Sequence, residues 1–223
     1  MSAPADTNPL LERMTRAGVV PVVVLEDARD AVPVAEAIAA GGCPLIEITL
    51  RTPAALPAIQ ALASHPEVMV GAGTVLNGDQ ARAAQAAGAR FIVAPGLDAG
   101  TVAVARALGL PVLPGVATAT EVQAAFNLGL RIVKYFPAGL LGGPPALRAL
   151  AEVFRDMRFM PTGGVREADL REYLGMPSVV ACGGSWLAPP ELISAGDYAG
   201  IERRVATAVS IARSVRAHGT STV

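Results

Sequence analysis

Short apolar runs rich in β-branched residues recur along the chain at intervals of 20 to 26 residues. The segments between them are rich in alanine and repeat apolar residues with helical period, as Leu147, Leu150, Ala151 and Phe154 do. This alternation predicts eight successive strand and helix units. The predicted strands are Val19–Leu25, Leu45–Leu50, Val68–Thr74, Phe91–Gly96, Pro111–Ala117, Ile132–Ala138, Arg158–Gly164 and Val179–Trp186.

The predicted strands are almost wholly apolar, which is typical of a parallel sheet covered by helices on both faces. Eight such units favour a closed (β/α)8 barrel, the TIM barrel architecture, with an open doubly wound sheet as the alternative. We expect residues 1–223 to form a single domain. An extra helix over Asn8–Arg16 should plug the N-terminal mouth of the barrel. The last helix should cover Tyr198–Val215, and we expect His218–Val223 to be a disordered tail.

Composition narrows the range of partners. The formal net charge is -1 and the arginines are scattered, so the chain offers no basic patch for nucleic acid or an anionic membrane. No apolar run reaches the roughly 18 residues that span a bilayer, and the first residues hold no apolar block typical of a signal peptide. We therefore expect a cytoplasmic protein that acts on small molecules.

Cysteine and histidine offer little chemistry. Cys43 and Cys182 are too few and too far apart for a disulfide framework or a zinc knuckle, and both lie in apolar context. His65 and His218 have no partner at metal-ligand spacing. We therefore expect two buried structural thiols and no metal site.

In a (β/α)8 barrel the carboxyl ends of the strands face the active site, so polar residues there are the first candidates. The most informative is Lys134, the only lysine in the chain, inside the apolar run Ile132–Ala138. Burial removes hydration from an ammonium and favours the neutral amine, which can attack a ketone and form an iminium. The alternative is a structural lysine that reaches solvent or pairs with a carboxylate. The full set of such candidates is Glu47, Thr49, Arg51, Thr74, Lys134, Thr162 and Ser185.

Glu47, Thr49 and Arg51 alternate along one predicted strand and should therefore point to the same face. In a barrel that polar face must be the interior, where charged groups are costly unless they serve each other or a ligand. A structural Glu47–Arg51 ion pair is one interpretation. The functional interpretation gives Glu47 a role in proton transfer and gives Arg51 the binding of a substrate carboxylate.

Paired glycines end the last two predicted strands, at Gly163-Gly164 and at Gly183-Gly184. Glycines let backbone N–H groups converge on an anion, and the loops after the seventh and eighth strands form the usual phosphate site of this architecture. Plain turns are the alternative. The two pairs at the two expected strand ends favour phosphate binding.

Five motifs together resemble the 2-keto-3-deoxy-6-phosphogluconate (KDPG) aldolase and 4-hydroxy-2-oxoglutarate aldolase family, over roughly Val19 to Trp186. They are Glu47-Ile48-Thr49-Leu50-Arg51-Thr52, Gly71-Ala72-Gly73-Thr74-Val75-Leu76, Lys134-Tyr135-Phe136-Pro137-Ala138, Pro161-Thr162-Gly163-Gly164 and Gly183-Gly184-Ser185-Trp186-Leu187. The resemblance implies a Schiff-base (class I) lyase of carbohydrate metabolism, in the Entner–Doudoroff pathway, with neither metal nor cofactor, that assembles as a homotrimer. It implies that Lys134 forms the Schiff base and that Glu47 is the acid and base.

The same resemblance implies a binding role for nine residues. Arg51 and Thr74 would hold the pyruvyl carboxylate, and Thr162 would contact the hydroxyl or carboxylate region of the substrate. The phosphate would bind at Gly163, Gly164, Gly184 and Ser185, and the pocket would be lined by Pro95 and Phe136. Tyr135 replaces the more common phenylalanine of the family at a position that should face away from Lys134.

The expected reaction is cleavage of a phosphorylated 2-keto acid, KDPG, to pyruvate and D-glyceraldehyde 3-phosphate. Thr49, Arg51 and Thr162 favour the gluconate substrate over its galactonate epimer, and 4-hydroxy-2-oxoglutarate is a plausible second substrate. Two other functions remain as alternatives. One is a phosphate-binding isomerase or epimerase that forms no covalent intermediate, and the other is a barrel that binds a metabolite without catalysis.

Overall fold

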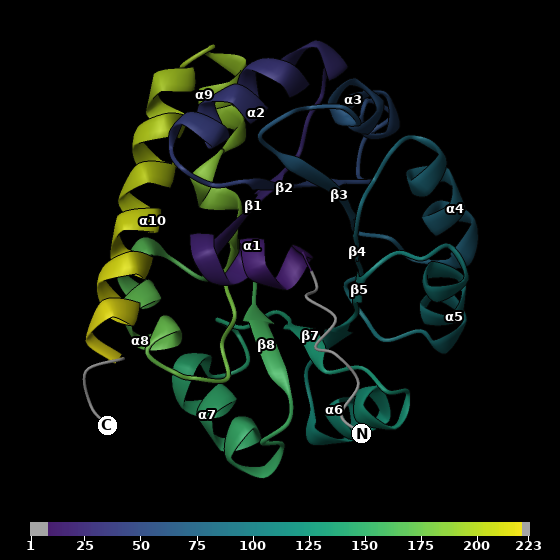
Figure 1. The fold of residues 1–223 in the computed structure, drawn as a ribbon, viewed down its shortest axis with the longest axis vertical. Coiled ribbons are helices and arrows are strands. Elements are labelled where there is room, and N and C mark those ends of the chain that lie inside the picture. Colours follow the sequence, from purple (N-terminus) through teal and green to yellow (C-terminus); the bar gives the residue numbers. More distant parts are fainter. Residues whose placement is uncertain (1–8, 220–223) are drawn as a thin grey trace.

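The computed structural model describes residues 9–219, and within them parallel strands form a ring surrounded by helices (Figure 1). The strands are β1 (Val19–Val23), β2 (Leu45–Thr49), β3 (Met69–Gly73), β4 (Ile92–Val93), β5 (Val112–Leu113), β6 (Gly115–Val116), β7 (Ile132–Tyr135), β8 (Arg158–Pro161) and β9 (Cys182–Gly184). The helices are α1 (Pro9–Ala17), α2 (Ala31–Ala40), α3 (Ala55–Leu62), α4 (Gly78–Ala86), α5 (Ala99–Ala107), α6 (Ala119–Asn127), α7 (Gly143–Val153), α8 (Leu170–Leu174), α9 (Pro190–Ser194) and α10 (Tyr198–Gly219). Short 3-10 helices are η1 (Ala28–Asp30), η2 (Glu167–Asp169) and η3 (Ser185–Leu187).

Hydrogen bonding and one continuous stretch of chain close the ring of strands. Six strands follow the order β5-β4-β3-β2-β1-β9, and three follow the order β6-β7-β8. At one seam only Pro114 separates β5 from β6. At the other, parallel bridges join Phe159 to Val179 and Thr162 to Gly183. The closed ring confirms the predicted (β/α)8 barrel, and the alternative of an open sheet is wrong.

Each observed strand lies within a predicted run, but the regular ladder is shorter than the apolar pattern. The run Phe91–Gly96, for example, contributes only Ile92–Val93 to β4. The run Pro111–Ala117 contains two strands, because Pro114 has no N–H group to donate to the ladder. The carbonyl of Pro114 still accepts a bond of 2.9 Å from the N–H of Lys134, so this interruption remains part of the barrel wall.

The extra helix α1 crosses the N-terminal mouth of the barrel, as predicted (Figure 1). Leu10, Met14 and Ala17 form the buried face of this helix. Arg13 ties the helix to the chain just before β2, since its Nη1 atom donates to the carbonyl of Pro44 at 3.4 Å. At the other end of the chain, α10 continues to Gly219 rather than ending at Val215. Of the predicted tail, residues 220–223 lie outside the described residues.

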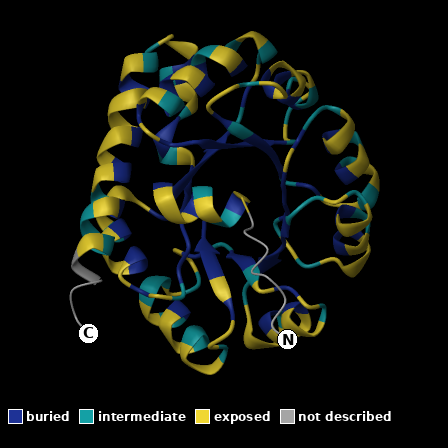
Figure 2. Ribbon diagram, in the orientation of Figure 1, coloured by how far each residue is buried: buried dark blue, intermediate teal, exposed yellow. Residues whose placement is uncertain are grey.

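Burial follows the layers of the barrel, with the strands buried and the outer faces of the helices exposed (Figure 2). The last side chain of several loops is the N-cap of the helix that follows. Asn77 and Asp98 accept hydrogen bonds from the third residue beyond them, and Thr118 forms a reciprocal capping box with Glu121. These caps fix where the chain turns from the rim of the barrel into the outer helical layer.

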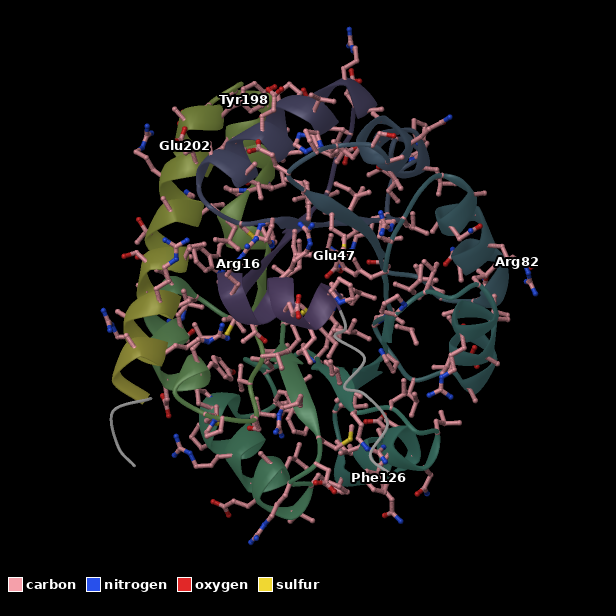
Figure 3. The ribbon with its side chains drawn as sticks, in the orientation of Figure 1. Arg16, Glu47, Arg82, Phe126, Tyr198 and Glu202 are labelled. Carbon is pink, nitrogen blue, oxygen red and sulfur yellow. The ribbon has the colours of Figure 1, made fainter. Side chains whose placement is uncertain are left out.

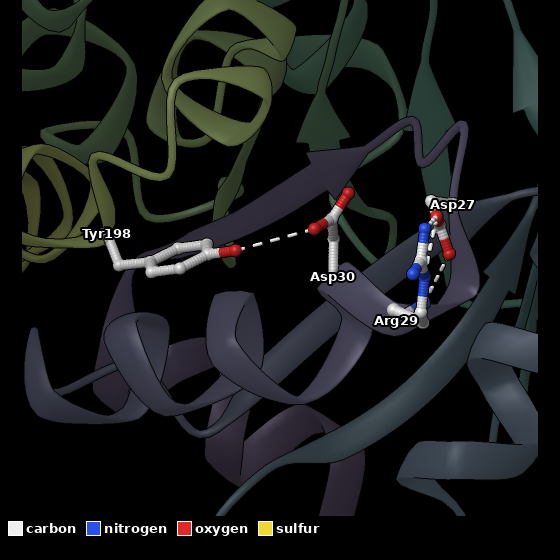
Figure 4. A network of polar contacts seen from close by, with 4 residues as sticks. All are labelled: Asp27, Arg29, Asp30 and Tyr198. Atoms are coloured by element: carbon white, nitrogen blue, oxygen red, sulfur yellow. Dashed lines mark hydrogen bonds and ion pairs between the residues drawn. The ribbon is translucent and has the colours of Figure 1, made fainter.

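The loop after β1 is held at the same rim by polar contacts (Figure 4). Tyr198, the first residue of α10, donates a hydrogen bond of 3.4 Å to Asp30. Asp27 caps η1 and pairs with Arg29 at 2.6 Å. The contact between Tyr198 and Asp30 joins the last helix to the first strand-to-helix loop, beside the carboxyl ends of the strands.

Candidate active site

Lys134 and Glu47 meet inside the barrel, although β7 and β2 are not neighbouring strands. The Nζ atom of Lys134 lies 3.8 Å from Oε1 of Glu47, and the two residues are 4% and 0% exposed. Placing two charged groups in a dry interior carries a large desolvation cost, which their mutual attraction offsets only in part. The sequence predicted both residues, and the structure brings them together.

This contact is an ion pair but not a hydrogen bond, because 3.8 Å exceeds hydrogen-bonding distance. Neither carboxylate oxygen of Glu47 has a hydrogen-bond partner among the described residues. The ring of Phe136 lies 5.0 Å from the Lys134 nitrogen and shields it. The pairing of Lys134 with a carboxylate, which was the structural alternative, is therefore present. However, a buried carboxylate with two unused acceptors is typical of a group that serves a ligand.

Glu47 fits into the barrel because β3 has a glycine, Gly73, beside its carboxylate. Gly71 pairs with Glu47 in the ladder, and Gly73 is next on the same face. A Cβ atom on Gly73 would overlap Oε1 of Glu47, and one on Gly71 would overlap the ring of Phe91. The sequence interpretation gave Gly73 no role of its own. Two alternating glycines within an apolar strand were the available signal, since they mark close approach of another group.

Two threonines fasten β2 to β1. The hydroxyl of Thr49 donates to the carbonyl of Val23 at 3.2 Å, and that of Thr52 donates to the carbonyl of Leu25 at 2.5 Å. Thr49 does share the interior face with Glu47, but its hydroxyl is already used by the backbone. The contribution of Thr52 was not predicted. These bonds fix the end of the strand that carries Glu47.

Arg51 lies beyond the end of β2 and is exposed, so it is at the mouth of the barrel rather than in its interior. Its Nε atom donates to Oγ1 of Thr74 at 3.3 Å. Within residues 9–219 Glu47 forms its ion pair with Lys134 and none with Arg51, so the structural Glu47–Arg51 pair is not formed. Two of the three side chains on the predicted polar face are thus buried, and the third is free to meet a solute.

The two glycine loops lie side by side, because Thr162 and Gly183 form a parallel bridge. Gly163 and Gly164 have φ values of 85° and 75°, which L side chains rarely adopt. A Cβ atom on Gly163 would also stand 2.9 Å from the ring of Phe136. Gly184 is buried, and Ser185 is exposed at the start of η3. The four residues predicted to bind phosphate therefore share one part of the rim.

Thr162 and Trp186 lie beside these loops and contact residues close to them in the chain. Thr162 is buried and its hydroxyl donates to the carbonyl of Met160 at 3.3 Å. The indole of Trp186, whose role was not predicted, packs against Gly184, and its Nε1 atom is buried without a hydrogen-bond partner. Both residues shape the floor below the paired glycines.

Pro95 lines a cavity of about 220 Å³ with apolar neighbours that include Val75, Leu97 and Pro114. Lys134 and Glu47 are not among the residues that line it. The carbonyl of Pro95 lies where a Cβ atom on Gly115 would stand, so this backbone is packed against β6. The role of Pro95 in lining the substrate pocket stays a prediction.

Within residues 9–219 there is no group of three or more His, Cys, Asp or Glu side chains that could hold a metal ion. In the same range no helix is both long enough and apolar enough to cross a membrane. Both cysteines are buried, and burial raises the pKa of Cys43 to about 12.

The arrangement thus combines a buried amine, an adjacent carboxylate, an exposed guanidinium and paired glycines. The chain is also similar to proteins of known function. The family model described as KDPG and KHG aldolase matches residues 10–204. A 2-dehydro-3-deoxy-phosphogluconate aldolase of Treponema pallidum is 47% identical over 190 residues, which cover 85% of this chain and 90% of that protein. The KHG/KDPG aldolase of Escherichia coli (strain K12) is 43% identical over 201 residues, or 90% and 94% of the two chains.

Solved structures give the same result. The KDPG aldolase of Legionella pneumophila, with pyruvate captured as a covalent carbinolamine, superposes with a TM-score of 0.85 at 37% identity, covering 89% of this chain and 97% of that one. From the extent of the family match and the identity to these relatives, we conclude that the chain belongs to the KDPG and KHG aldolase family.

Proposed function

We propose that the chain is a class I aldolase that cleaves 2-dehydro-3-deoxy-6-phosphogluconate to pyruvate and D-glyceraldehyde 3-phosphate through a Schiff base on Lys134. The observation that carries this proposal is the ion pair of 3.8 Å between the buried Lys134 and the buried Glu47. The substrate follows from relatives named 2-dehydro-3-deoxy-phosphogluconate aldolase, among them the protein of Zymomonas mobilis, which is 50% identical over 178 residues.

The first stage forms the imine. Arg51 binds the substrate carboxylate with its fork of N–H donors and places the C2 ketone above Lys134. Glu47 takes a proton from the ammonium of Lys134, which leaves a neutral amine, and the amine attacks C2 to give a carbinolamine. Glu47 then returns the proton to the carbinolamine oxygen, which leaves as water. Because the two side chains are adjacent in the barrel interior, this proton needs no path to solvent.

The second stage breaks the bond between C3 and C4. Glu47, now a carboxylate, accepts the proton of the C4 hydroxyl, directly or through water. The electron pair of the C3–C4 bond moves toward the iminium, giving an enamine of pyruvate, and the aldehyde carrying the phosphate departs. Protonation of the enamine at C3 and hydrolysis of the imine release pyruvate and restore Lys134.

The phosphate of the substrate binds at Gly163, Gly164, Gly184 and Ser185 in this proposal. The left-handed glycines leave backbone N–H groups open to an anion, and Ser185 is exposed beside them. Cleavage of 4-hydroxy-2-oxoglutarate to pyruvate and glyoxylate uses the same amine and carboxylate without these phosphate contacts. The name of the relative from Escherichia coli, a KHG/KDPG aldolase, supports this second activity.

A borohydride trap tests the central step. The protein is incubated with pyruvate, reduced and digested, and we expect a reduced pyruvyl adduct on the peptide that contains Lys134. The Lys134→Ala variant should give neither adduct nor cleavage. Isomerisation or epimerisation of a phosphorylated substrate without a trapped adduct would favour the isomerase or epimerase, and binding without turnover would favour a non-catalytic barrel.

A Glu47→Gln variant tests the role of Glu47 separately from that of Lys134. It keeps the shape of the carboxylate but removes its basicity, so we expect kcat to fall by about 10²-fold to 10⁴-fold, as for the loss of a general base. Circular dichroism checks that the barrel is intact. A variant that folds and turns over at the original rate would remove Glu47 from proton transfer.

The proposal also covers the oligomeric state of the protein and its location in the cell. We propose a homotrimer on the resemblance to the family, which light scattering coupled to size-exclusion chromatography can measure. We propose a cytoplasmic location within the Entner–Doudoroff pathway, because a substrate charged at both carboxylate and phosphate does not diffuse across a bilayer. Fractionation of the source cells tests this location.

A further inference from the structure

Three arginines line a cavity of about 450 Å³ at the N-terminal end of the barrel. Arg13 and Arg16 come from α1 and Arg213 comes from α10. The cavity also includes Cys43 and Pro44, which precede β2, whereas Arg51 follows it. It therefore lies at the end of the barrel opposite to the substrate-binding rim. Arg16 is labelled on α1 in Figure 3.

The charges around this cavity are poorly balanced. Within residues 9–219 none of the three guanidinium groups forms an ion pair, and Glu67 is the single acidic residue among those that line the cavity. Three positive groups and one negative group leave a local excess of two positive charges, in a chain whose net charge is -1. Like charges that face one cavity repel each other, and an anion bound among them would offset that repulsion.

The shape of the cavity also suits a small anion. Arg13 is held by its bond of 3.4 Å to the carbonyl of Pro44. Gly42 also lines the cavity, and the Nη2 atom of Arg213 lies 3.8 Å from the place of a Cβ atom on it, so the guanidinium group faces a residue without a side chain. Guanidinium forks match the geometry of phosphate oxygens and bind them by paired, charge-assisted hydrogen bonds.

We propose that this cavity is a second anion site, which binds the phosphate group of a free phosphate ion or of a small phosphorylated metabolite. Such an anion would join α1 and α10 to the segment that leads into β2. Glu47 lies two residues after the first residue of β2. An anion bound in this cavity would therefore lie next to the start of the strand that carries the proposed catalytic carboxylate. The proposal is independent of the reaction at Lys134.

Hydrogen exchange tests the site and separates it from the phosphate loops at the other end. Exchange is followed by mass spectrometry with and without inorganic phosphate, pyrophosphate or glycerol 3-phosphate. The proteins are the wild type, the double variant Arg16→Gln/Arg213→Gln, and the charge-matched control Arg82→Gln/Arg90→Gln, whose two arginines do not line the cavity. We expect the anions to slow exchange over residues 9–17 and 39–45 in the wild type and the control.

In the Arg16→Gln/Arg213→Gln variant this protection should require at least tenfold more anion. Protection that is equal in all three proteins, absent from all three, or weakened equally by both double variants would overturn the proposal. The three probes distinguish the source, since a free ion gives protection with inorganic phosphate and a metabolite site prefers the ester. Thermal unfolding in phosphate-free buffer checks folding, and the single variants Arg16→Gln and Arg213→Gln replace the double variant if it does not fold.

Discussion

The Nε atom of Arg51 donates a hydrogen bond of 3.3 Å to Oγ1 of Thr74, and Thr74 has a φ of 57°. It is the one non-glycine residue with positive φ among residues 9–219. For a β-branched residue this conformation costs about 1 to 3 kcal/mol. The strain therefore coincides with the hydroxyl that orients the proposed carboxylate-binding arginine.

Replacing Thr74 by glycine should separate stability from substrate binding. Thr74→Gly relieves the strained backbone but gives the unfolded chain more freedom, so we expect the free energy of unfolding to rise by about 1 kcal/mol. Because Arg51 loses its partner, KM should rise several-fold. Urea denaturation and steady-state kinetics measure the two effects. A less stable variant with unchanged KM would contradict this account of Thr74.

Arg51→Lys is the matched change on the other side of the bond. Lysine keeps the charge but lacks the fork that binds both oxygens of a carboxylate. We expect KM to rise about tenfold or more, with little change in the free energy of unfolding because Arg51 is exposed. An unchanged KM would show that the carboxylate binds elsewhere.

Gly73→Ala should impair catalysis by moving Glu47. The added Cβ atom would overlap Oε1 of Glu47, so the carboxylate must shift away from Lys134. We expect kcat to fall by about tenfold to a hundredfold, since a displacement near 1 Å can cost that much. Gly71→Ala is the control on the same strand, because its Cβ atom would meet Phe91 instead. It should lower stability with a smaller effect on kcat, and equal kinetic effects in the two variants would count against a specific role for Gly73.

These residues show how far the sequence could lead. The alternation of Glu47, Thr49 and Arg51 and the single lysine were enough to identify Glu47 and Lys134 as candidates, but not to show that the two side chains form an ion pair. The alternation of side chains along a strand could not show that Arg51 lies outside the barrel interior, because β2 ends at Thr49 and the alternation does not continue beyond it. Nor could it show that the hydroxyls of Thr49 and Thr162 bond to the backbone, or that Thr74 adopts positive φ. Those features depend on neighbours brought close by the fold.

The fold was predictable for a related reason. The spacing of the apolar runs predicts alternating strands and helices. Strands that are apolar on both faces must be covered on both, and the barrel covers them. The ends of the strands depend on individual backbone bonds. Pro114 shows this, since its missing N–H divides an apolar run that the pattern presented as continuous.

Ser185→Ala should distinguish the two proposed substrates. The exposed hydroxyl of Ser185 lies beside the glycine pairs, where the phosphate is proposed to bind. Loss of one hydrogen bond to a charged phosphate should raise KM for the phosphorylated substrate by about tenfold. The kcat/KM for 4-hydroxy-2-oxoglutarate, which has no phosphate, should stay within about twofold. A parallel loss on both substrates would argue against the phosphate role.

Buried acids of high pKa predict a loss of stability in alkaline solution. Burial raises the pKa of Cys43 to about 12 and is also the main cause that raises the pKa of Tyr173 to about 12. The unfolded chain releases these protons at lower pH than the folded chain does. It then binds fewer protons, so the free energy of unfolding falls as pH rises from about 9 toward 12.

Cys43→Ala tests this by removing one of the groups. Between about pH 9.5 and 11, the slope of the free energy of unfolding against pH should become shallower by about 1.4 kcal/mol per pH unit. Urea titrations at several pH values give that slope. The difference in free energy of unfolding between the two proteins at about pH 7 gives the packing cost of the substitution. An unaltered slope would mean that Cys43 ionises equally in both states.

The two threonine bonds from β2 to β1 have a consequence for protein engineering. Thr49 and Thr52 hold the end of β2 through the backbone carbonyls of Val23 in β1 and of Leu25 just beyond it, independently of the side chains that follow. The exposed Pro53 and the half-buried Ala54 lie immediately beyond these anchors. Libraries that vary these two positions can therefore reshape the entrance for new aldehydes while Glu47 and Lys134 keep their spacing.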